Sequence, residues 1–316
     1  MCIRDRFRTA SISNEKGFLF KNFDHLQKLT KVTSIVFDKT GTITTGIFKV
    51  KSITSKNGQE NDSVLQYVAS LEQQSNHPIA KSILLEAESK DIPLLPTSDF
   101  IEKVGVGVEG NVDGKSVSVS KASGGENTVT TLNVEIEKKQ FTIELEEESQ
   151  IDSGFINNLT EDYEVSILSG DSYKKVQKFG ELLGVKDSLG DQTPEDKVSY
   201  IKNLQRDRTV AFLGDGINDS PALKQADVGI ASTHSTQIAQ SAGDIIIHKG
   251  GIGKIIEIIS VAIKSQNRIK QNLFLAFVYN TAMIPIAISG NISPNMAALA
   301  MAASSVSVVF NSARKL

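Results

Sequence analysis

The chain has 316 residues, of which 34 are basic and 37 acidic, so its formal net charge is -3. This balance argues against a protein whose affinity comes from neutralising nucleic-acid phosphates. A single cysteine, Cys2, excludes an intramolecular disulfide and a zinc site built from cysteines. The length exceeds what one hydrophobic core usually serves, so we expect two soluble units and an appendage.

Changes in sequence pattern divide the chain into segments. Residues 1–6 have neither the apolar region nor the cleavage site of a secretory signal. We interpret residues 1–30 as a membrane-proximal lead-in with a truncated or foreign start; the alternative is an ordinary frayed terminus. The remaining predicted boundaries are 31–45 and 143–262 for the two parts of one domain, 46–142 for an inserted domain, and 263–316 for a helical hairpin.

Three short apolar runs predict buried parallel strands. Residues 32–37 lead into DKTGT, residues 165–168 into SGD, and residues 209–213 into GDGIND. Helical patterns at 173–183 and 195–204 lie between them, as a doubly wound α/β fold requires. Because ligands bind at the carboxyl ends of parallel strands, we expect the three polar loops to converge on one crevice.

The segment 46–142 has a different pattern. Helices are predicted at 63–72 and 78–89, followed by alternating strands around Asp113-Gly114, a dipeptide that favours a tight hairpin. We interpret the segment as an inserted α+β domain. The acidic run at 144–148 is interpreted as a solvated edge rather than a binding site.

The polar loops supply the groups that phosphoryl transfer needs. Asp38 is a candidate nucleophile at the end of a strand, and Ser169 offers a hydroxyl for a phosphoryl oxygen. Lys197 offers a fixed positive charge, and Asp215 a hard oxygen ligand for magnesium. Each residue alone is more often a loop cap or a surface charge, but their joint occurrence favours a catalytic site. The predicted set is completed by Lys39 and Thr40 in the turn after Asp38. Asp38 and Thr40 are also predicted magnesium ligands, and Gly170, Asp171, Asn218 and Asp219 are predicted to support phosphate and metal.

The motifs DKTGT, SGD, TPEDK and GDGINDSPAL, in this order and with an insertion after the first, resemble the phosphorylation domain of P-type ATPases. The core of that domain belongs to the haloacid dehalogenase superfamily, and the resemblance implies that ATP phosphorylates Asp38. The chain departs from the family pattern at two places. Ser169 stands where threonine is usual, and residues 145–154 (LEEESQIDSG) replace an expected Asp and Arg-Pro pattern, which leaves the contacts near the hinge open.

The inserted segment carries a further signature. Ser-Asn-His-Pro at 75–78 resembles the motif of heavy-metal-transporting P-type ATPases, in which the histidine orients adenine; this implies that His77 binds ATP, with Glu72 as its companion. The sequence GVGVEG at 105–110 matches the letters of a dinucleotide fingerprint, but strands rather than a helix are predicted after it. We therefore reject NAD. The resemblance to the metal-pump family, in which paired glycines let the backbone lie against the nucleotide, implies instead that Gly105 and Gly107 bind ATP.

Two uncharged apolar segments end the chain, at residues 273–289 and 294–310, and each is long enough with slight extension to cross a bilayer. Basic residues lie outside both segments and none lies between them, which predicts a transmembrane hairpin with both ends in the cytoplasm. The alternative is a pair of buried core helices.

Neutral and soft side chains lie within these segments. Tyr279 and Asn280 in the first, with Met301 and Ser305 in the second, resemble the copper-transporting branch, and a thioether suits monovalent copper. The alternative role for the small residues is helix packing.

The resemblance implies a fragment of a copper(I)-translocating P-type ATPase with ATP and Mg²⁺ as cofactors and Cu⁺ as the transported ion. It implies an integral protein of the bacterial inner membrane with cytoplasmic catalytic domains, partnered by lipid and by a missing N-terminal half that carries an actuator domain and a Cys-Pro-Cys helix. A copper chaperone is a further candidate partner. The alternatives are a pump for silver or zinc, a soluble haloacid dehalogenase-like phosphatase, and a non-catalytic binding subunit, which would be expected to have lost Asp38, Lys197 or Asp215.

Overall fold

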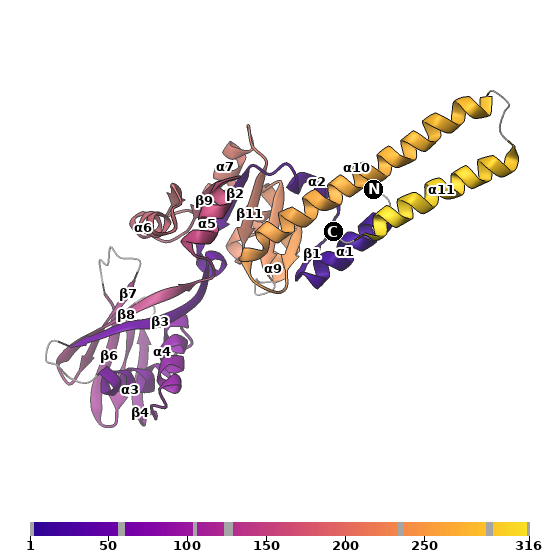
Figure 1. Ribbon diagram of the computed structural model, residues 1–316. Helices are drawn as coiled ribbons and strands as arrows, with labels where there is room; N and C mark the ends of the chain where they lie inside the picture. The colour runs from indigo at the N-terminus through magenta and orange to yellow at the C-terminus, as the bar shows by residue number, and fades with distance from the viewer. Residues whose placement is uncertain are drawn as a thin grey trace. The chain divides into compact units, whose positions relative to one another are not determined.

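The computed structural model describes residues 3–55, 61–103, 106–122, 129–232, 237–288 and 293–314. The chain forms two compact units (Figure 1). The first unit comprises residues 1–38, 157–166 and 193–316, and the second comprises residues 39–156 and 167–192. Of the predicted connection between the two apolar segments, residues 290–293, only Ser293 lies within the described residues.

A seven-stranded sheet has the order β1-β13-β12-β11-β2-β9-β10. β2 and β11 pair in parallel, as do β11 with β12 and β12 with β13, whereas the edge strand β1 pairs antiparallel with β13. All residues of β2 and β11 are buried, which explains why they read as continuous apolar runs. The strands are β1 (Phe18–Phe20), β2 (Ser34–Asp38), β9 (Glu164–Leu168), β10 (Asp187–Leu189), β11 (Val210–Gly214), β12 (Val228–Ser232) and β13 (Ile245–Ile247).

Short helices connect these strands, as the predicted doubly wound α/β pattern requires. The helix α7 (Pro194–Leu204) begins with a capping box, in which Thr193 and Asp196 exchange hydrogen bonds between side chain and backbone. The helix α6 (Tyr173–Leu183) ends at Gly184, whose φ of 82° is the left-handed conformation that stops a helix. The others are α2 (Asp24–Leu29), α5 (Ser153–Thr160), α8 (Ser220–Gln225) and α9 (Gln237–Ala242), with short 3₁₀ turns η2 (Ile217–Asp219) and η3 (Ile252–Lys254).

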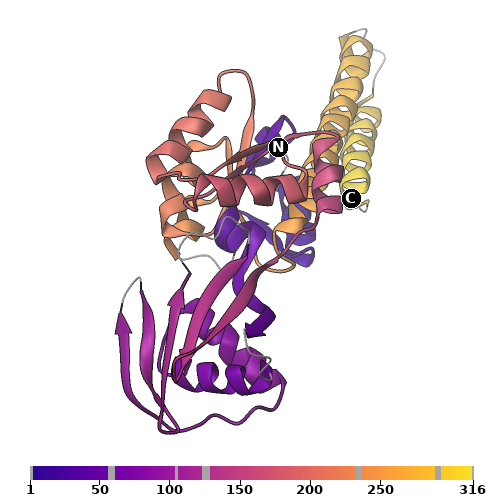
Figure 2. The ribbon, with the colours of Figure 1, turned by 90° about the vertical axis from the view of Figure 1, so that its left-hand side faces the viewer.

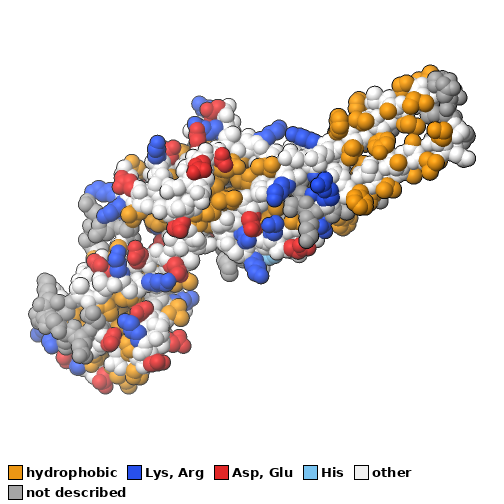
Figure 3. All heavy atoms as spheres, in the orientation of Figure 1, with side chains coloured by type: hydrophobic (Ala, Val, Ile, Leu, Met, Phe, Trp, Pro, Cys, Tyr) orange, Lys and Arg blue, Asp and Glu red, His pale blue; other side chains and the backbone are white. Residues whose placement is uncertain are grey.

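A long helical hairpin lies in the first unit. The helices α10 (Ile255–Ile288) and α11 (Pro294–Ala313) run side by side, and α1 (Ile3–Glu15) packs against both (Figure 1). Amide and hydroxyl groups join them: Asn272 donates to Ser312 Oγ at 2.9 Å, and Asn311 donates to Asn272 Oδ1 at 2.8 Å. Hydrophobic side chains cover much of the visible face of α10 and α11 beyond this junction (Figure 3).

Among the residues that the structure describes, no helix is both long and apolar enough to cross a membrane. The predicted transmembrane pair at 273–289 and 294–310 is therefore not confirmed. The first predicted segment is the distal part of the longer helix α10, and the second coincides with most of α11.

The second unit contains a six-stranded antiparallel sheet in the order β3-β8-β7-β6-β5-β4. The helices α3 (Asn61–Glu72) and α4 (Pro78–Ser89) cover one face of it and close a core that includes Leu65, Ile83 and Leu145 (Figure 2). Asp113 and Gly114, with φ of 49° and 74°, form the predicted tight turn between β5 and β6. The strands are β3 (Thr44–Ser55), β4 (Thr97–Lys103), β5 (Gly107–Val112), β6 (Lys115–Lys121), β7 (Thr130–Ile136) and β8 (Lys139–Ser149).

Candidate functional site

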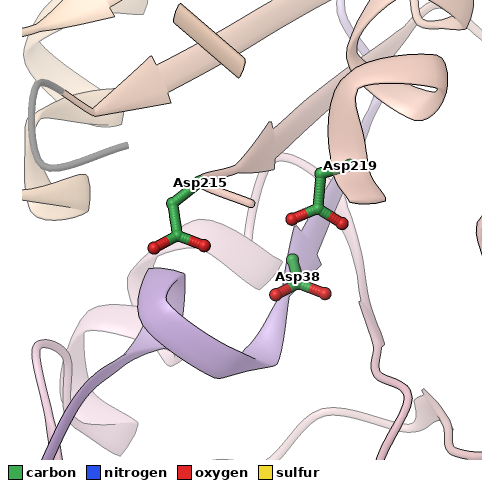
Figure 4. A group of neighbouring side chains, drawn as sticks. All are labelled: Asp38, Asp215 and Asp219. Carbon is green, nitrogen blue, oxygen red and sulfur yellow. The ribbon is translucent and has the colours of Figure 1, made fainter. Parts of the chain in front are cut away.

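Three carboxylates meet at the carboxyl end of the parallel sheet. Asp38 is the last residue of β2, Asp215 directly follows β11, and Asp219 ends η2 (Figure 4). One ligand oxygen from each lies within 4.8 Å of the other two. Because β2 and β11 are parallel neighbours, their polar ends come together at one edge, as the sequence predicted for Asp38 and Asp215.

Lys197 joins this cluster from α7. Its ammonium donates to Asp38 Oδ1 and, at 2.7 Å, to Asp219 Oδ1. Only 6% of Lys197 is exposed, so these charge-assisted hydrogen bonds lie in surroundings of low polarity. The capping box at Thr193 fixes the first turn of α7, which brings Lys197 to the carboxylates.

The electrostatics of the cluster leave it short of positive charge. Burial, with the nearby Asp219 carboxylate, raises the pKa of Asp38 to about 7, against the attraction of Lys197. Burial, again with Asp219, raises the pKa of Asp215 to about 6. Burial lowers the pKa of Lys197, but the charges of Asp38 and Asp219 outweigh it and leave that pKa raised. One cation thus faces three acids.

The donor set fits Mg²⁺. Carboxylate oxygens are the hard ligands that this ion prefers, and a divalent ion would balance the surplus negative charge of the cluster. The GDGIND loop is shaped around Asp219: the Gly216 amide donates to Asp219 Oδ2 at 3.1 Å. A Cβ at Gly214 would lie 2.9 Å from the Cβ of Asp219, so the loop needs glycine there. Asn218 is exposed beside Asp219 in η2.

The other predicted phosphate residues lie in the second unit. Ser169 is buried, and its Oγ accepts a hydrogen bond from the amide of Asp171 at 3.1 Å across Gly170. Thr40 is exposed in the turn that follows Asp38. The ammonium of Lys39 is buried and donates to Asp171 Oδ2 at 2.6 Å.

Lys39 also donates to Glu147 Oε2 at 3.2 Å. Glu147 belongs to the acidic run 144–148, so its interpretation as part of a solvated edge is wrong: the side chain is only 13% exposed. Although burial lowers the pKa of Lys39, Glu147 and Asp171 outweigh it and leave that pKa raised. The contacts of Glu147 were missed because a run of like charges does not itself show which member points inward.

Glu72, His77 and Gly107 line one cavity of about 310 Å³. Gly105 lies outside the described residues. The size suits a bound small molecule, and the walls combine apolar side chains with a few polar groups. The other lining residues are Ser75, Ile79, Glu102, Lys103, Val106, Val108, Val119, Ser120, Lys121 and Leu132.

Local structure fixes each of these groups. His77 caps α4, and its Nδ1 accepts a hydrogen bond from the amide of Ile79 at 3.2 Å, which leaves Nε2 as the protonated ring nitrogen. Burial, with the nearby Glu102, raises the pKa of Glu72 to about 7. Gly107 has a φ of 153°, and a Cβ there would lie 2.0 Å from the carbonyl oxygen of Val119. Only glycine permits this approach of β5 to β6.

A second cavity of about 450 Å³ shares His77, Ile79 and Lys121 with the first. Its lining balances charges: the basic residues are Lys39, Lys49, Lys121 and Lys175, and the acidic residues are Glu146, Glu147, Glu148 and Asp171. Nothing in the sequence marked Lys49, Lys121 or Lys175, because isolated lysines on separate elements form no motif.

The predicted ligands of the transported metal lie in the hairpin. Tyr279 is half-buried on α10, whereas Met301 and Ser305 are exposed on α11. The side chain of Asn280 lies outside the described residues.

Comparisons with known proteins agree with this geometry. The family model of the haloacid dehalogenase-like hydrolases matches residues 32–227. A copper-exporting P-type ATPase of Staphylococcus saprophyticus is 35% identical over 95% of this chain and 40% of its own length. Copper-transporting ATPase 1 of Rhizobium meliloti is 36% identical with the same coverage. The chain thus spans 40% of the length of these curated relatives.

Solved structures that resemble this chain also come from ATPases. A zinc-transporting PIB-type ATPase in its E2.Pi state superposes with a TM-score of 0.87 at 26% identity, over 98% of this chain and 54% of that one. The catalytic domain of the CPx-ATPase CopB-B superposes with a TM-score of 0.66 at 31% identity, over 79% of this chain and 98% of that one. The chain therefore belongs to the haloacid dehalogenase-like hydrolase family, and over nearly its whole length it is similar to heavy-metal P-type ATPases.

Proposed function

We propose that the chain is the catalytic part of a copper(I)-transporting P-type ATPase, which binds MgATP and is phosphorylated on Asp38. The observation that carries this proposal is the cluster in which a buried lysine holds Asp38 and Asp219 beside Asp215. It combines a nucleophile, a cation and metal-binding carboxylates within a few ångströms, which is what phosphoryl transfer requires.

Asp38 acts as the nucleophile. A carboxylate oxygen of Asp38 forms a bond to the γ-phosphorus while the bond from that phosphorus to the bridging oxygen breaks, and ADP leaves with that oxygen. Lys197, already within hydrogen-bond distance of Asp38, neutralises the negative charge that gathers on the transferring group. Asp219 anchors Lys197 and the GDGIND loop.

Asp38 and Asp215 would hold magnesium, and Thr40 would complete its ligands from the turn. The bound ion supplies charge neutralisation at the phosphate oxygens. The cavity lined by Glu72, His77 and Gly107 takes the adenine ring, with the polar ring nitrogen of His77 available to it. Lys121, which lines both cavities, would supply a positive charge for the phosphates.

The copper assignment rests on the relatives and on the hairpin. The two curated relatives are named for copper, whereas one solved neighbour transports zinc. No Asp or Glu occurs from Leu273 to the end of the chain, and a doubly charged zinc ion in an apolar environment would require a carboxylate nearby. Tyr279, Asn280, Met301 and Ser305 suit a soft monovalent ion instead.

We also propose that the outer part of the hairpin contacts membrane lipid and an N-terminal half of the pump. Large apolar side chains there are exposed, which is costly in water. They include Leu273, Phe274, Phe277, Ile288, Leu299 and Phe310. This proposal places the protein in the bacterial inner membrane with its catalytic units in the cytoplasm, where a copper chaperone would deliver the ion.

Incubation of the purified chain with γ-labelled ATP and Mg²⁺ tests the catalytic proposal. We expect an acid-stable, hydroxylamine-labile label on the wild-type chain and none on Asp38→Asn, since the amide cannot form an acyl phosphate. Label from a phosphomonoester but not from ATP would instead support the soluble phosphatase.

A further inference from the structure

The glutamates of β8 face in two directions. Side chains alternate along a strand, and Phe141, Ile143 and Leu145 are all buried in the core of the second unit. Glu147 continues this inward register. Glu146 and Glu148 point the other way and pair with the exposed lysines Lys51 and Lys49.

Both carboxylate oxygens of Glu147 are engaged. Oε1 accepts a hydrogen bond from the hydroxyl of Thr44 at 2.6 Å, and Oε2 accepts one from the ammonium of Lys39 at 3.2 Å. Thr44 is fully buried and Lys39 is 8% exposed. Charge-assisted hydrogen bonds in such surroundings define positions sharply.

These two partners bracket the turn that follows Asp38. Lys39 begins the turn, and Thr44 directly follows its end at Ile43. Within the turn, Gly41 has a φ of 76°, and its amide donates to Thr44 Oγ1 at 3.4 Å. The carboxylate of Glu147 on β8 therefore holds both ends of the turn that follows Asp38.

Lys39 is also paired with Asp171, at 2.6 Å, and its ammonium lies 5.6 Å from the ring centroid of Phe179. Two carboxylates already neutralise the charge of the Lys39 ammonium. Lys39 therefore contributes more to holding the shape of the turn than to binding a phosphate. Residues 145–154, which depart from the family pattern, therefore include a residue with specific contacts, Glu147.

We propose that Glu147 is a positioning residue for phosphoryl transfer: it fixes the turn after Asp38 through Lys39 and Thr44. This inference rests on the proposed function of Asp38. Glu147 does not touch the reacting atoms but acts through the backbone of the turn. It also links that turn to β8, the strand through which the chain returns from the six-stranded sheet.

The test compares Glu147→Gln with Glu144→Gln in the full 316-residue chain. Glu144 is a matched control, because it also lies on β8 and accepts a hydrogen bond from a β3 hydroxyl, that of Ser52 at 3.0 Å. We expect Glu147→Gln to slow labelling of Asp38 at saturating ATP by about tenfold or more, because small misplacements of reacting groups cost about this much. The ATP concentration for half-maximal labelling should stay within about twofold of wild type.

Glu147→Asp keeps the charge and should recover part of the labelling rate, whereas Glu144→Gln should leave it unchanged. Equal losses in both glutamine variants, or a normal rate in Glu147→Gln, would overturn the proposal. Amide hydrogen exchange across residues 39–44 provides a readout that does not depend on labelling. We expect exchange there to rise about tenfold in Glu147→Gln but not in Glu144→Gln.

These readouts separate the two claims. An unlabelled wild-type chain with faster exchange in Glu147→Gln would contradict the proposed function and leave the turn-holding contact standing. A labelled wild-type chain with unchanged exchange in Glu147→Gln would overturn the positioning role alone.

Discussion

Replacing Asp38, the proposed nucleophile, should stabilise the chain in the absence of metal. Burial raises the pKa of Asp38 from its ordinary 3.8 to about 7. Ionising this carboxyl therefore costs more in the folded chain than in the unfolded chain, by about 4 kcal/mol at 1.4 kcal/mol for each tenfold change in the ionisation constant. Asparagine has nearly the same shape and carries no charge, so Asp38→Asn removes this cost.

The effect depends on pH in a defined direction. Because the pKa is raised on folding, the unfolded chain releases the proton first, and wild-type stability falls as pH rises from about 4 to about 7. We expect Asp38→Asn to be more stable than wild type by about 4 kcal/mol at pH 8 and by less than about 1 kcal/mol at pH 4.

Urea unfolding followed by circular dichroism, with a chelator present, measures this difference. Asp207→Asn, at an exposed position in the same unit, is the control and should change the midpoint little at either pH. A loss of stability in Asp38→Asn at pH 8, or a gain of equal size at both pH values, would refute the reasoning.

Further predictions follow from the two sites. Asp215→Ala should raise the Mg²⁺ concentration needed for labelling by about tenfold or more, because a hard oxygen ligand is lost. An unchanged Mg²⁺ titration would show that Asp215 is not a ligand of the metal. Mg²⁺ affinity of the wild type, measured by calorimetry, should fall as pH drops through about 7 and 6, where Asp38 and Asp215 take up protons; a flat profile would contradict this. His77→Gln should raise the half-maximal ATP concentration by about tenfold and affect the maximal labelling rate less; equal changes would indicate a structural role. In a pump completed with an N-terminal half, Met301→Ala should lower the apparent affinity for copper(I), and activation by zinc alone would contradict the copper assignment.

The sequence predicted β2 and β11 correctly, because buried parallel strands form uninterrupted apolar runs. It also predicted that Asp38 and Asp215 lie at the same edge of the sheet, because the carboxyl ends of parallel strands meet there. It also predicted α4 with His77 at its N-terminus. Proline in the first turn and a capping residue before it are local signals that tertiary contacts did not override.

Other features could not be predicted from local pattern. Glu147 lies among neighbouring acidic residues, and its inward direction follows only from the register of β8 against β3. The helix α1 was also missed: it is weakly amphipathic, and contacts such as Thr9 with Ser265 come from residues 256 positions apart. Such pairings are set by the packing of α10 and α11, which residues 3–15 alone do not reveal.

The central claim is that ATP phosphorylates Asp38, and borohydride reduction tests it most directly. Borohydride converts an aspartyl phosphate to homoserine, so the modified residue can be located by peptide mass spectrometry after incubation with MgATP. We predict homoserine at position 38, dependent on both ATP and Mg²⁺, and none when phosphoryl transfer is blocked with Lys197→Ala. Conversion at another aspartate, or ATP hydrolysis with position 38 unmodified, would contradict the account.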